Sequence, residues 1–295
     1  MAKKNPLFIK VSGEPRAARL DTSTLFKQDD TNQLSPIDTY IERSKALFVK
    51  LGNLEREGHI KADDDRELYN LFLLGMVSNV ESYFRHLFRE LILFDAISYG
   101  QCLEQQLTYA AAMHHDQKLL PEALLEQCTF ISFDNIKSTT KSFLDLTINK
   151  GSADHKELVE SLFEFEQLCQ LRHCIVHRAG LLGSKNAIKL GIDKHKGFFE
   201  KPIFLDLNFL QESNVICMNS VKNFNNFIFN SILKRYVDNN KSSIAWNYNI
   251  DRKWFKKYFE LFDSPLLNDE LRNRGAKYYT HKDAYNELKN YHTNA

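Results

Sequence analysis

Turn-forming residues are scarce in this chain of 295 residues, which has only 11 glycines and 6 prolines. All-β architectures need many tight turns, and glycine and proline supply them, so this scarcity favours helices. Net charge is also low, because 39 Lys and Arg residues oppose 38 Asp and Glu residues. That balance argues against a polybasic protein that binds phosphates through its bulk charge, and it leaves room for a local basic groove.

The five cysteines are scattered, and no two of them form a Cys-x-x-Cys pair, so neither a disulfide framework nor a zinc ribbon is expected. The N-terminal residues hold only a short apolar run before Gly13 and Glu14, which does not fit a signal peptide. Charged residues interrupt the longest apolar stretches, so no membrane-spanning segment is expected. We predict a soluble, cytoplasmic protein that does not associate with membranes.

Apolar residues recur at helical spacing over most of the chain, and they make up enough of it, at 43%, to exclude a mainly disordered protein. The pattern predicts helices from Pro36 to the region 52–58, over 63–94, over 133–146, over 154–178 and over 210–236. It also predicts shorter helices within 103–128, interrupted at Pro121, and two or three more after residue 237.

One segment departs from helical spacing. Ala187–Ile192 and Ile203–Leu207 flank a turn-rich stretch, which predicts a small β-hairpin. The predicted fold class is therefore an all-α bundle with a small β-hairpin insertion and extra C-terminal helices. The expected organisation is an N-terminal arm over 1–36, a helical domain over 37–240 and a C-terminal helical extension over 241–295.

An arginine lies in the middle of the apolar stripe of the helix predicted over 154–178. At 100° per residue, Arg172 falls between Phe165 on one side and Leu168 on the other. A charged side chain on an apolar stripe is costly unless a partner or a ligand satisfies it. Arg172 is therefore a candidate functional residue, and a structural ion pair is the alternative.

A carboxylate occupies the equivalent place on another helix. Glu81 falls between Leu74 and Phe88 on the apolar stripe of the helix predicted over 63–94. Two opposite charges on two buried stripes predict a contact between Glu81 and Arg172. Such a pair would form an ionic link inside the bundle, and it would also orient the guanidinium toward a ligand.

Two histidines lie on the polar flank of the same helix as Arg172. His173 and His177 have the i, i+4 spacing that places two imidazoles on one zinc ion. No Glu follows His173 as in a His-Glu-x-x-His motif and no third ligand is evident, so no metal is expected. The simpler interpretation of His177 is a cation at a helix C-terminus. Cys169 and Cys174 lack an activating neighbour and are interpreted as core residues.

The segment Arg172–His177, followed by a small residue and Gly180, resembles the R-(N/D/H)-x-x-x-H motif of the HEPN superfamily. The segment Ser78–Phe84 looks like the first core helix of that family, and residues 187–236 resemble the branch found in bacterial defence and conflict systems. The resemblance covers about residues 37–237.

This resemblance implies a metal-independent endoribonuclease without a cofactor, acting as a toxin or antiphage-defence effector. Arg172 and His177 would be catalytic, with His173 and Glu81 in support, and the products would have 2′,3′-cyclic phosphate and 5′-hydroxyl ends. RNA would be the substrate, a homodimer would form a composite active site, and an antitoxin or activator protein is a further expected partner.

Two alternatives remain open at this stage. The chain is alternatively a non-catalytic HEPN dimerisation or interaction module, or a regulatory subunit.

In the C-terminal extension, Arg252–Tyr258 interleaves cations with aromatic rings, as nucleic-acid surfaces do, and an amphipathic surface helix has the same pattern. Residues 241–295 would alternatively bind an activator or an inhibitor.

Overall fold

The computed structural model describes residues 9–26, 34–114 and 116–293. The chain divides into two units, residues 1–33 and 34–295. The described part of the first unit, residues 9–26, is exposed throughout and contains the short 3-10 helix Ser23–Leu25. The rest of that unit, which belongs to the predicted N-terminal arm, lies outside the described residues.

The described residues of the second unit contain helices and no β-strand, which confirms the all-α fold class. The α-helices are α1 (Pro36–Arg56), α2 (Arg66–Phe94), α3 (Ala96–Cys102), α4 (Tyr109–His114), α5 (Leu120–Leu125), α6 (Phe133–Leu144), α7 (Lys156–Arg178), α8 (Ser184–His195), α9 (Leu207–Asn239), α10 (Tyr248–Phe262), α11 (Pro265–Asn273) and α12 (His281–Thr293). Short 3-10 helices, η2 (Ala153–His155) and η3 (Lys196–Phe198), precede α7 and follow α8. No helix of the described residues is both long and apolar enough to cross a membrane.

Local signals determine where the long helices begin and end. The Ser35 hydroxyl accepts a hydrogen bond from the backbone N–H of Asp38 at 3.3 Å, and Pro36 follows at the first helical position, so α1 starts where the sequence predicts. At the end of α7, Ala179 has a φ of 50° and Gly180 a φ of 80°. This left-handed pair lets the Gly180 N–H reach the Cys174 carbonyl at 3.0 Å, which ends the helix.

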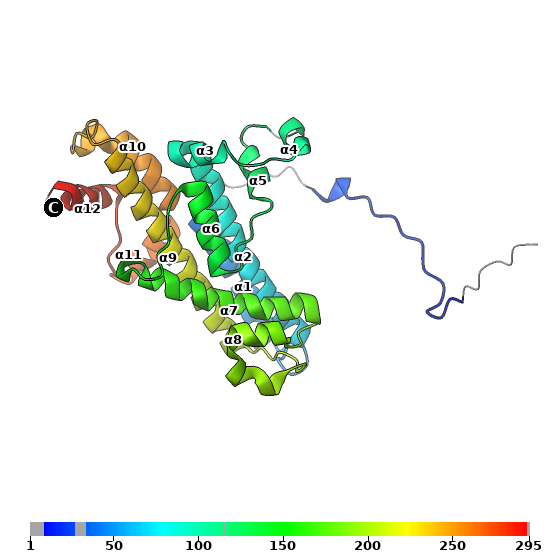
Figure 1. Cartoon of the computed structure of the whole chain (residues 1–295). Coiled ribbons are helices and arrows are strands. Elements are labelled where there is room, and N and C mark those ends of the chain that lie inside the picture. The colour runs from blue at the N-terminus through cyan, green and yellow to red at the C-terminus, as the bar shows by residue number, and fades with distance from the viewer. Residues whose placement is uncertain (1–8, 27–33, 115, 294–295) are drawn as a thin grey trace, which may run out of the picture. The chain divides into compact units, whose positions relative to one another are not determined.

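Helix α2 lies at the centre of the bundle and contacts α1, α7 and α9 (Figure 1). Phe84 and Phe88 of α2 are fully buried and contact the ring of Phe224 on α9. A polar link crosses this core: the Tyr83 hydroxyl donates to the side-chain Oδ1 of Asn225 at 3.0 Å, and the side-chain Nδ2 of Asn225 donates to the backbone carbonyl of Phe262 in α10 at 2.9 Å. These contacts fix the positions of α2, α9 and α10 relative to one another.

The helices of the C-terminal extension pack on α9 and on each other. Trp254 of α10 stacks on Tyr236 of α9, with ring centroids 4.5 Å apart. The Tyr285 hydroxyl of α12 donates to the buried carboxylate of Asp251 on α10 at 2.6 Å. The aromatic residues interleaved with cations in α10 face this core, since Phe255 is fully buried. The second unit therefore includes the extension as part of one packed body.

The predicted β-hairpin insertion is wrong. Its first arm is part of α8, because Ala187 is buried and Leu190 half-buried against Cys174 of α7, and a spacing of three residues is helical. Backbone pairing occurs instead at the base of the segment, where the Leu182 N–H donates to the Lys201 carbonyl at 3.0 Å. This pairing is an isolated bridge rather than a ladder.

Candidate functional site

Arg172 lies where the buried stripe of α7 reaches the solvent. Phe165 is fully buried and Leu168 is 3% exposed, whereas Val176, one turn after Arg172, is 48% exposed. The arginine itself is half-buried. Among the described residues, its guanidinium forms no hydrogen bond and no ion pair within 4.0 Å. The group is therefore held at the edge of the core with its donors unused.

Glu81 of α2 and Arg172 of α7 influence each other without direct contact. Partial burial raises the pKa of Glu81, and the positive charges of Arg172 and then Arg85 oppose this rise. The Phe130 backbone N–H also donates a hydrogen bond to the Glu81 carboxylate. The two charges thus share the α2–α7 interface as the stripes predict, but the predicted direct contact is wrong, because no ion pair forms between these two described side chains. The Phe130 N–H is the donor to the carboxylate in its place. Arg85 acts on Glu81 only through its charge, because its guanidinium donates to the backbone carbonyls of Leu125 and Cys128.

His173 and His177 lie on one face of α7, next to Arg172. Their rings are 5.7 Å apart between centroids and 82° between planes. His177 is exposed and His173 is half-buried. Partial burial, then the charge of Arg172 and the neighbouring His177, lowers the pKa of His173 below its usual value, so its ring is mainly neutral at pH 7.

The Nε2 atom of His173 is sealed from solvent and has no hydrogen-bond partner among the described residues. A charged imidazole has a proton on both ring nitrogens, so charging His173 would add an unpaired buried donor. Burial of Nε2 therefore keeps the ring neutral and disfavours its protonation. An exposed imidazole, a neutral imidazole and a guanidinium with free donors lie within two turns of one helix, which suits phosphate binding combined with proton transfer.

Helix α8 borders the face of α7 on which the histidines lie. Residues 166, 170, 173 and 177 follow one another at helical spacing, so they share a face. The Asn186 amide of α8 donates to the backbone and side-chain oxygens of Gln170 at 3.3 and 3.2 Å. Lys189 lies 3.9 Å from the Glu166 carboxylate. The sequence pattern does not single out these α8 residues, because it predicts a hairpin in this segment.

The cysteines of the segment are core residues, as interpreted from the sequence. Cys169 and Cys174 are both fully buried. Burial raises the pKa of each thiol, so both remain protonated and weakly nucleophilic near neutral pH. Within the described ranges, no group of three or more His, Cys, Asp or Glu side chains is arranged to hold a metal ion.

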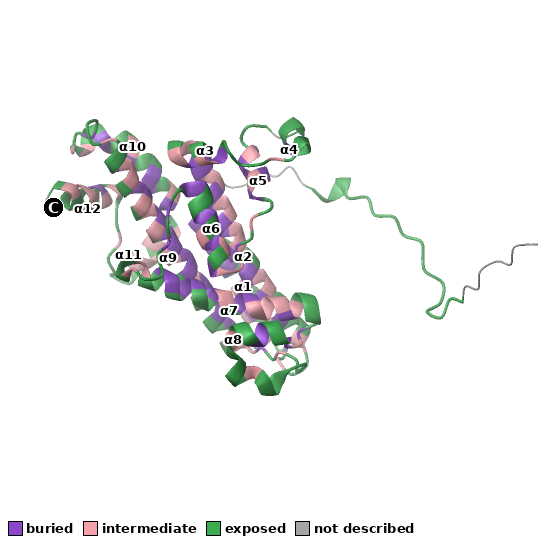
Figure 2. Cartoon of the chain, viewed as in Figure 1, coloured by how far each residue is buried: buried purple, intermediate pink, exposed green. Residues whose placement is uncertain are grey.

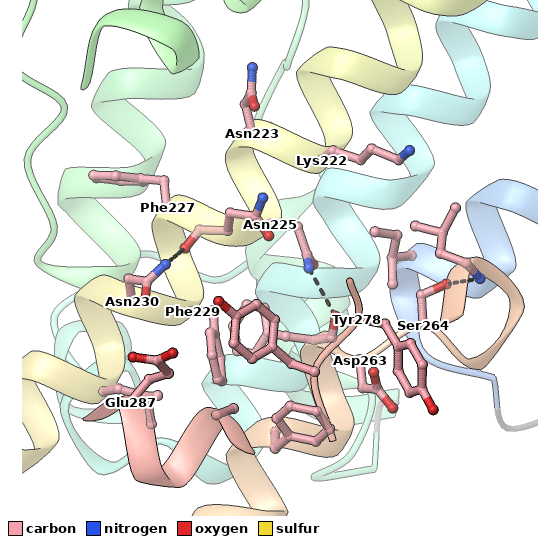
Figure 3. A pocket seen from close by; sticks show the side chains of 18 of the residues that line it. Lys222, Asn223, Asn225, Phe227, Phe229, Asn230, Asp263, Ser264, Tyr278 and Glu287 are labelled. Atoms are coloured by element: carbon pink, nitrogen blue, oxygen red, sulfur yellow. Dashed lines mark hydrogen bonds between the residues drawn. The ribbon is translucent and has the colours of Figure 1, made fainter. Parts of the chain in front are cut away.

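A cleft of about 1090 Å³ lies elsewhere in the second unit. Figure 3 shows it between α9, which provides Asn223 and Phe227, and the C-terminal helices, which provide Glu287 of α12. Its lining includes Leu158 at the beginning of α7 but none of the four candidate residues. Leu158 and Arg172 are separated by about 21 Å along the helix axis. The cleft and the motif are thus at different ends of α7.

Comparison with known proteins adds no relative, since no family model, no curated protein and no solved structure matches this chain.

Proposed function

We propose that this chain is a metal-independent endoribonuclease of the HEPN type, with Arg172 and His177 as its catalytic residues. The observation that supports this proposal is that both side chains lie at one end of α7, reach the solvent and have no hydrogen-bond or ion-pair partner among the described residues. Buried polar groups are normally paired within the fold, so the half-buried guanidinium of Arg172, which has no partner there, is available to a ligand.

The proposed reaction needs a base, an acid and a cation. One imidazole takes the proton of the ribose 2′-hydroxyl, and the oxygen attacks the adjacent phosphorus. The bond to the 5′-oxygen then breaks, and a second imidazole gives that oxygen a proton. The guanidinium of Arg172 binds the phosphorane oxygens, whose negative charge increases in the transition state. The products are a 2′,3′-cyclic phosphate and a 5′-hydroxyl.

A homodimer would supply the second set of groups. A two-fold axis near the end of α7 would bring two copies of Arg172 and His177 around one RNA strand. His173, neutral at pH 7, would assist proton transfer. Glu81 is a positioning residue in this scheme, because its charge acts on the guanidinium without occupying its donors. An antitoxin or activator protein would control such an enzyme in the cell.

The direct test is incubation of the purified full chain with a single-stranded RNA in EDTA, followed by identification of the product ends. We expect Arg172→Ala and His177→Ala to lower the cleavage rate by about a hundredfold or more. His59→Ala is the matched control, since His59 is also an exposed histidine but lies after α1. Full cleavage by either motif variant, with its thermal unfolding unchanged, would refute the assignment.

The rival function is a non-catalytic dimerisation or interaction module, or a regulatory subunit. The exposure of Val176 favours it, because an apolar side chain between Arg172 and His177 suits a protein contact. A chain that forms a dimer but leaves RNA intact in every condition would support the module. Toxicity on expression that disappears with His177→Ala would support the enzyme.

A further inference from the structure

A lysine-rich segment lies beside the proposed active site. Residues 185–201, here called the lysine arm, comprise most of α8, η3 and the three residues that follow, and they contain five lysines but only two acidic residues. All five lysines are exposed, namely Lys185, Lys189, Lys194, Lys196 and Lys201. The whole chain has a net charge of only +1, so this is a local concentration of positive charge.

Few of these charges are neutralised within the fold. Glu200, one of the two acids, forms an ion pair with Arg178 at the end of α7. Lys189 is near Glu166 at 3.9 Å, and the other four lysines of the arm form no ion pair among the described residues. Free exposed ammonium groups spaced along an element fit a polyanion, since each can release a counterion from one phosphate.

Exposed aromatic rings accompany the lysines in this segment. Phe198 is 58% exposed and Phe199 is 40% exposed, and they lie between Lys196 and Lys201 in the chain. In α10 the sequence pattern is similar, but there Phe255 and Tyr258 are buried and Trp254 is half-buried. The lysine arm thus offers rings on which bases stack, whereas α10 does not.

The arm lies along the same side of α7 as the histidines. Asn186 and Lys189 contact Gln170 and Glu166, which share the helical face of His173. The end of the arm then returns to the segment that follows α7, where the Lys201 carbonyl accepts a hydrogen bond from the Leu182 N–H at 3.0 Å, and Glu200 pairs with Arg178 at the end of α7. Figure 1 shows α8 directly beside the C-terminal part of α7, and Figure 2 shows most of the arm as exposed.

We propose that the lysine arm is the surface that binds single-stranded RNA and holds it against the end of α7. The lysines bind successive phosphates, and Phe198 and Phe199 stack on unpaired bases. The inference rests on the proposed ribonuclease function for the identity of the polyanion. Charge complementarity and exposed rings on one element favour an unpaired strand over a duplex, whose bases are not available for stacking.

The test measures binding separately from cleavage. A fluorescein-labelled, 2′-O-methyl RNA of 20 nucleotides has no free 2′-hydroxyl, so it reports binding by anisotropy whether or not the chain cleaves RNA. Replacing Lys185, Lys194, Lys196 and Lys201 together by Gln should weaken binding and make the plot of log K against log salt less steep by about 3. Phe198→Ala with Phe199→Ala should weaken binding by about fivefold or more.

The matched control replaces four exposed lysines outside the arm by Gln, namely Lys50, Lys118, Lys253 and Lys282. It removes the same net charge from other parts of the surface. Because the proposal depends on the position of the lysines, we expect this control variant to keep the wild-type affinity and the wild-type salt dependence. Equal loss in both lysine sets, or no loss in the arm set, would overturn the proposal. Binding of the arm to phosphatidylserine vesicles without binding to RNA would overturn it as well.

The two proposals fail in different ways. Binding that depends on the arm, with no cleavage of unmodified RNA, would refute the nuclease and keep the surface. Cleavage that depends on His177, with wild-type binding and cleavage in the arm variants, would keep the nuclease and refute the surface.

Discussion

Arg235 of α9 joins three parts of the bundle through one buried guanidinium. It lies 2.6 Å from the Asp95 carboxylate, and the two side chains are only 13% and 5% exposed. It also donates to the Leu144 carbonyl at the end of α6. Asp95 accepts further hydrogen bonds from Ser98 at the start of α3 and from Tyr258 of α10 at 3.1 Å.

We expect Arg235→Ala to be among the most destabilising substitutions in this chain. Removing one partner of a buried ion pair leaves the other charge uncompensated, which costs about 3–5 kcal/mol. Each kcal/mol lowers the melting temperature of a domain of this size by about 2–4 °C, so the expected loss is roughly 6–20 °C. Truncation of Asp95 together with Arg235 should cost less than the sum of the two single changes, because the double variant leaves no buried charge.

The assay is urea unfolding followed by circular dichroism, with a thermal scan of each variant. Arg252→Ala is the control, because Arg252 is exposed on α10 and should change the free energy of unfolding by less than about 0.5 kcal/mol. A loss below about 1 kcal/mol for Arg235→Ala, or strictly additive effects of the two truncations, would show that this network is not a structural centre of the fold.

Three further perturbations test other parts of the structure. Arg172→Ala should raise the pKa of Glu81 further, because the Arg172 charge opposes the effect of burial, and an NMR titration of the carboxylate measures this. Burial raises the pKa of Asp38 in the folded state above its unfolded-state pKa of about 3.9. Protonated Asp38 therefore contributes fully to the stability of the fold below the unfolded-state pKa, and this contribution is lost as the pH rises through the folded-state pKa. The stability of Asp38→Asn relative to wild type, measured by urea unfolding, should therefore increase between pH 4 and pH 7. Gly183→Ala should displace Arg178, since a Cβ there would lie 2.8 Å from the Arg178 Cδ. Because Arg178 pairs with Glu200 of the lysine arm, this change should weaken RNA binding, measured by anisotropy, while thermal unfolding stays close to that of the wild type.

The helices that the sequence predicts well are those with local start and stop signals. Ser35 and Pro36 begin α1, and Gly180 ends α7, because caps and left-handed residues act within a few positions of the chain. Helix α3 was missed, since it follows α2 directly and begins at Asp95 without any glycine or proline between them. A single capping aspartate within a continuous helical pattern is not enough to predict that a new helix begins there.

The candidate site was predictable to the level of residues and helix faces. The stripes of α2 and α7 correctly indicate that Glu81 and Arg172 share an interface, because helical periodicity fixes which residues face the core. They do not give the separation of the charges. That depends on the tertiary structure, in which the backbone N–H of Phe130, from a distant part of the chain, donates to the Glu81 carboxylate.

The presence, ends and inward faces of the long helices follow from the amino-acid sequence, because they depend on neighbours within about one helical turn. The lysine arm depends on the tertiary structure. Its alternating apolar residues suit a strand, and only the burial of Ala187 against Cys174 of α7 makes the segment a helix. Docking on α7 leaves the five lysines and two phenylalanines of the arm exposed, whereas Phe255 and Tyr258 of α10 turn their rings into the core, since burial is decided by the partner surface.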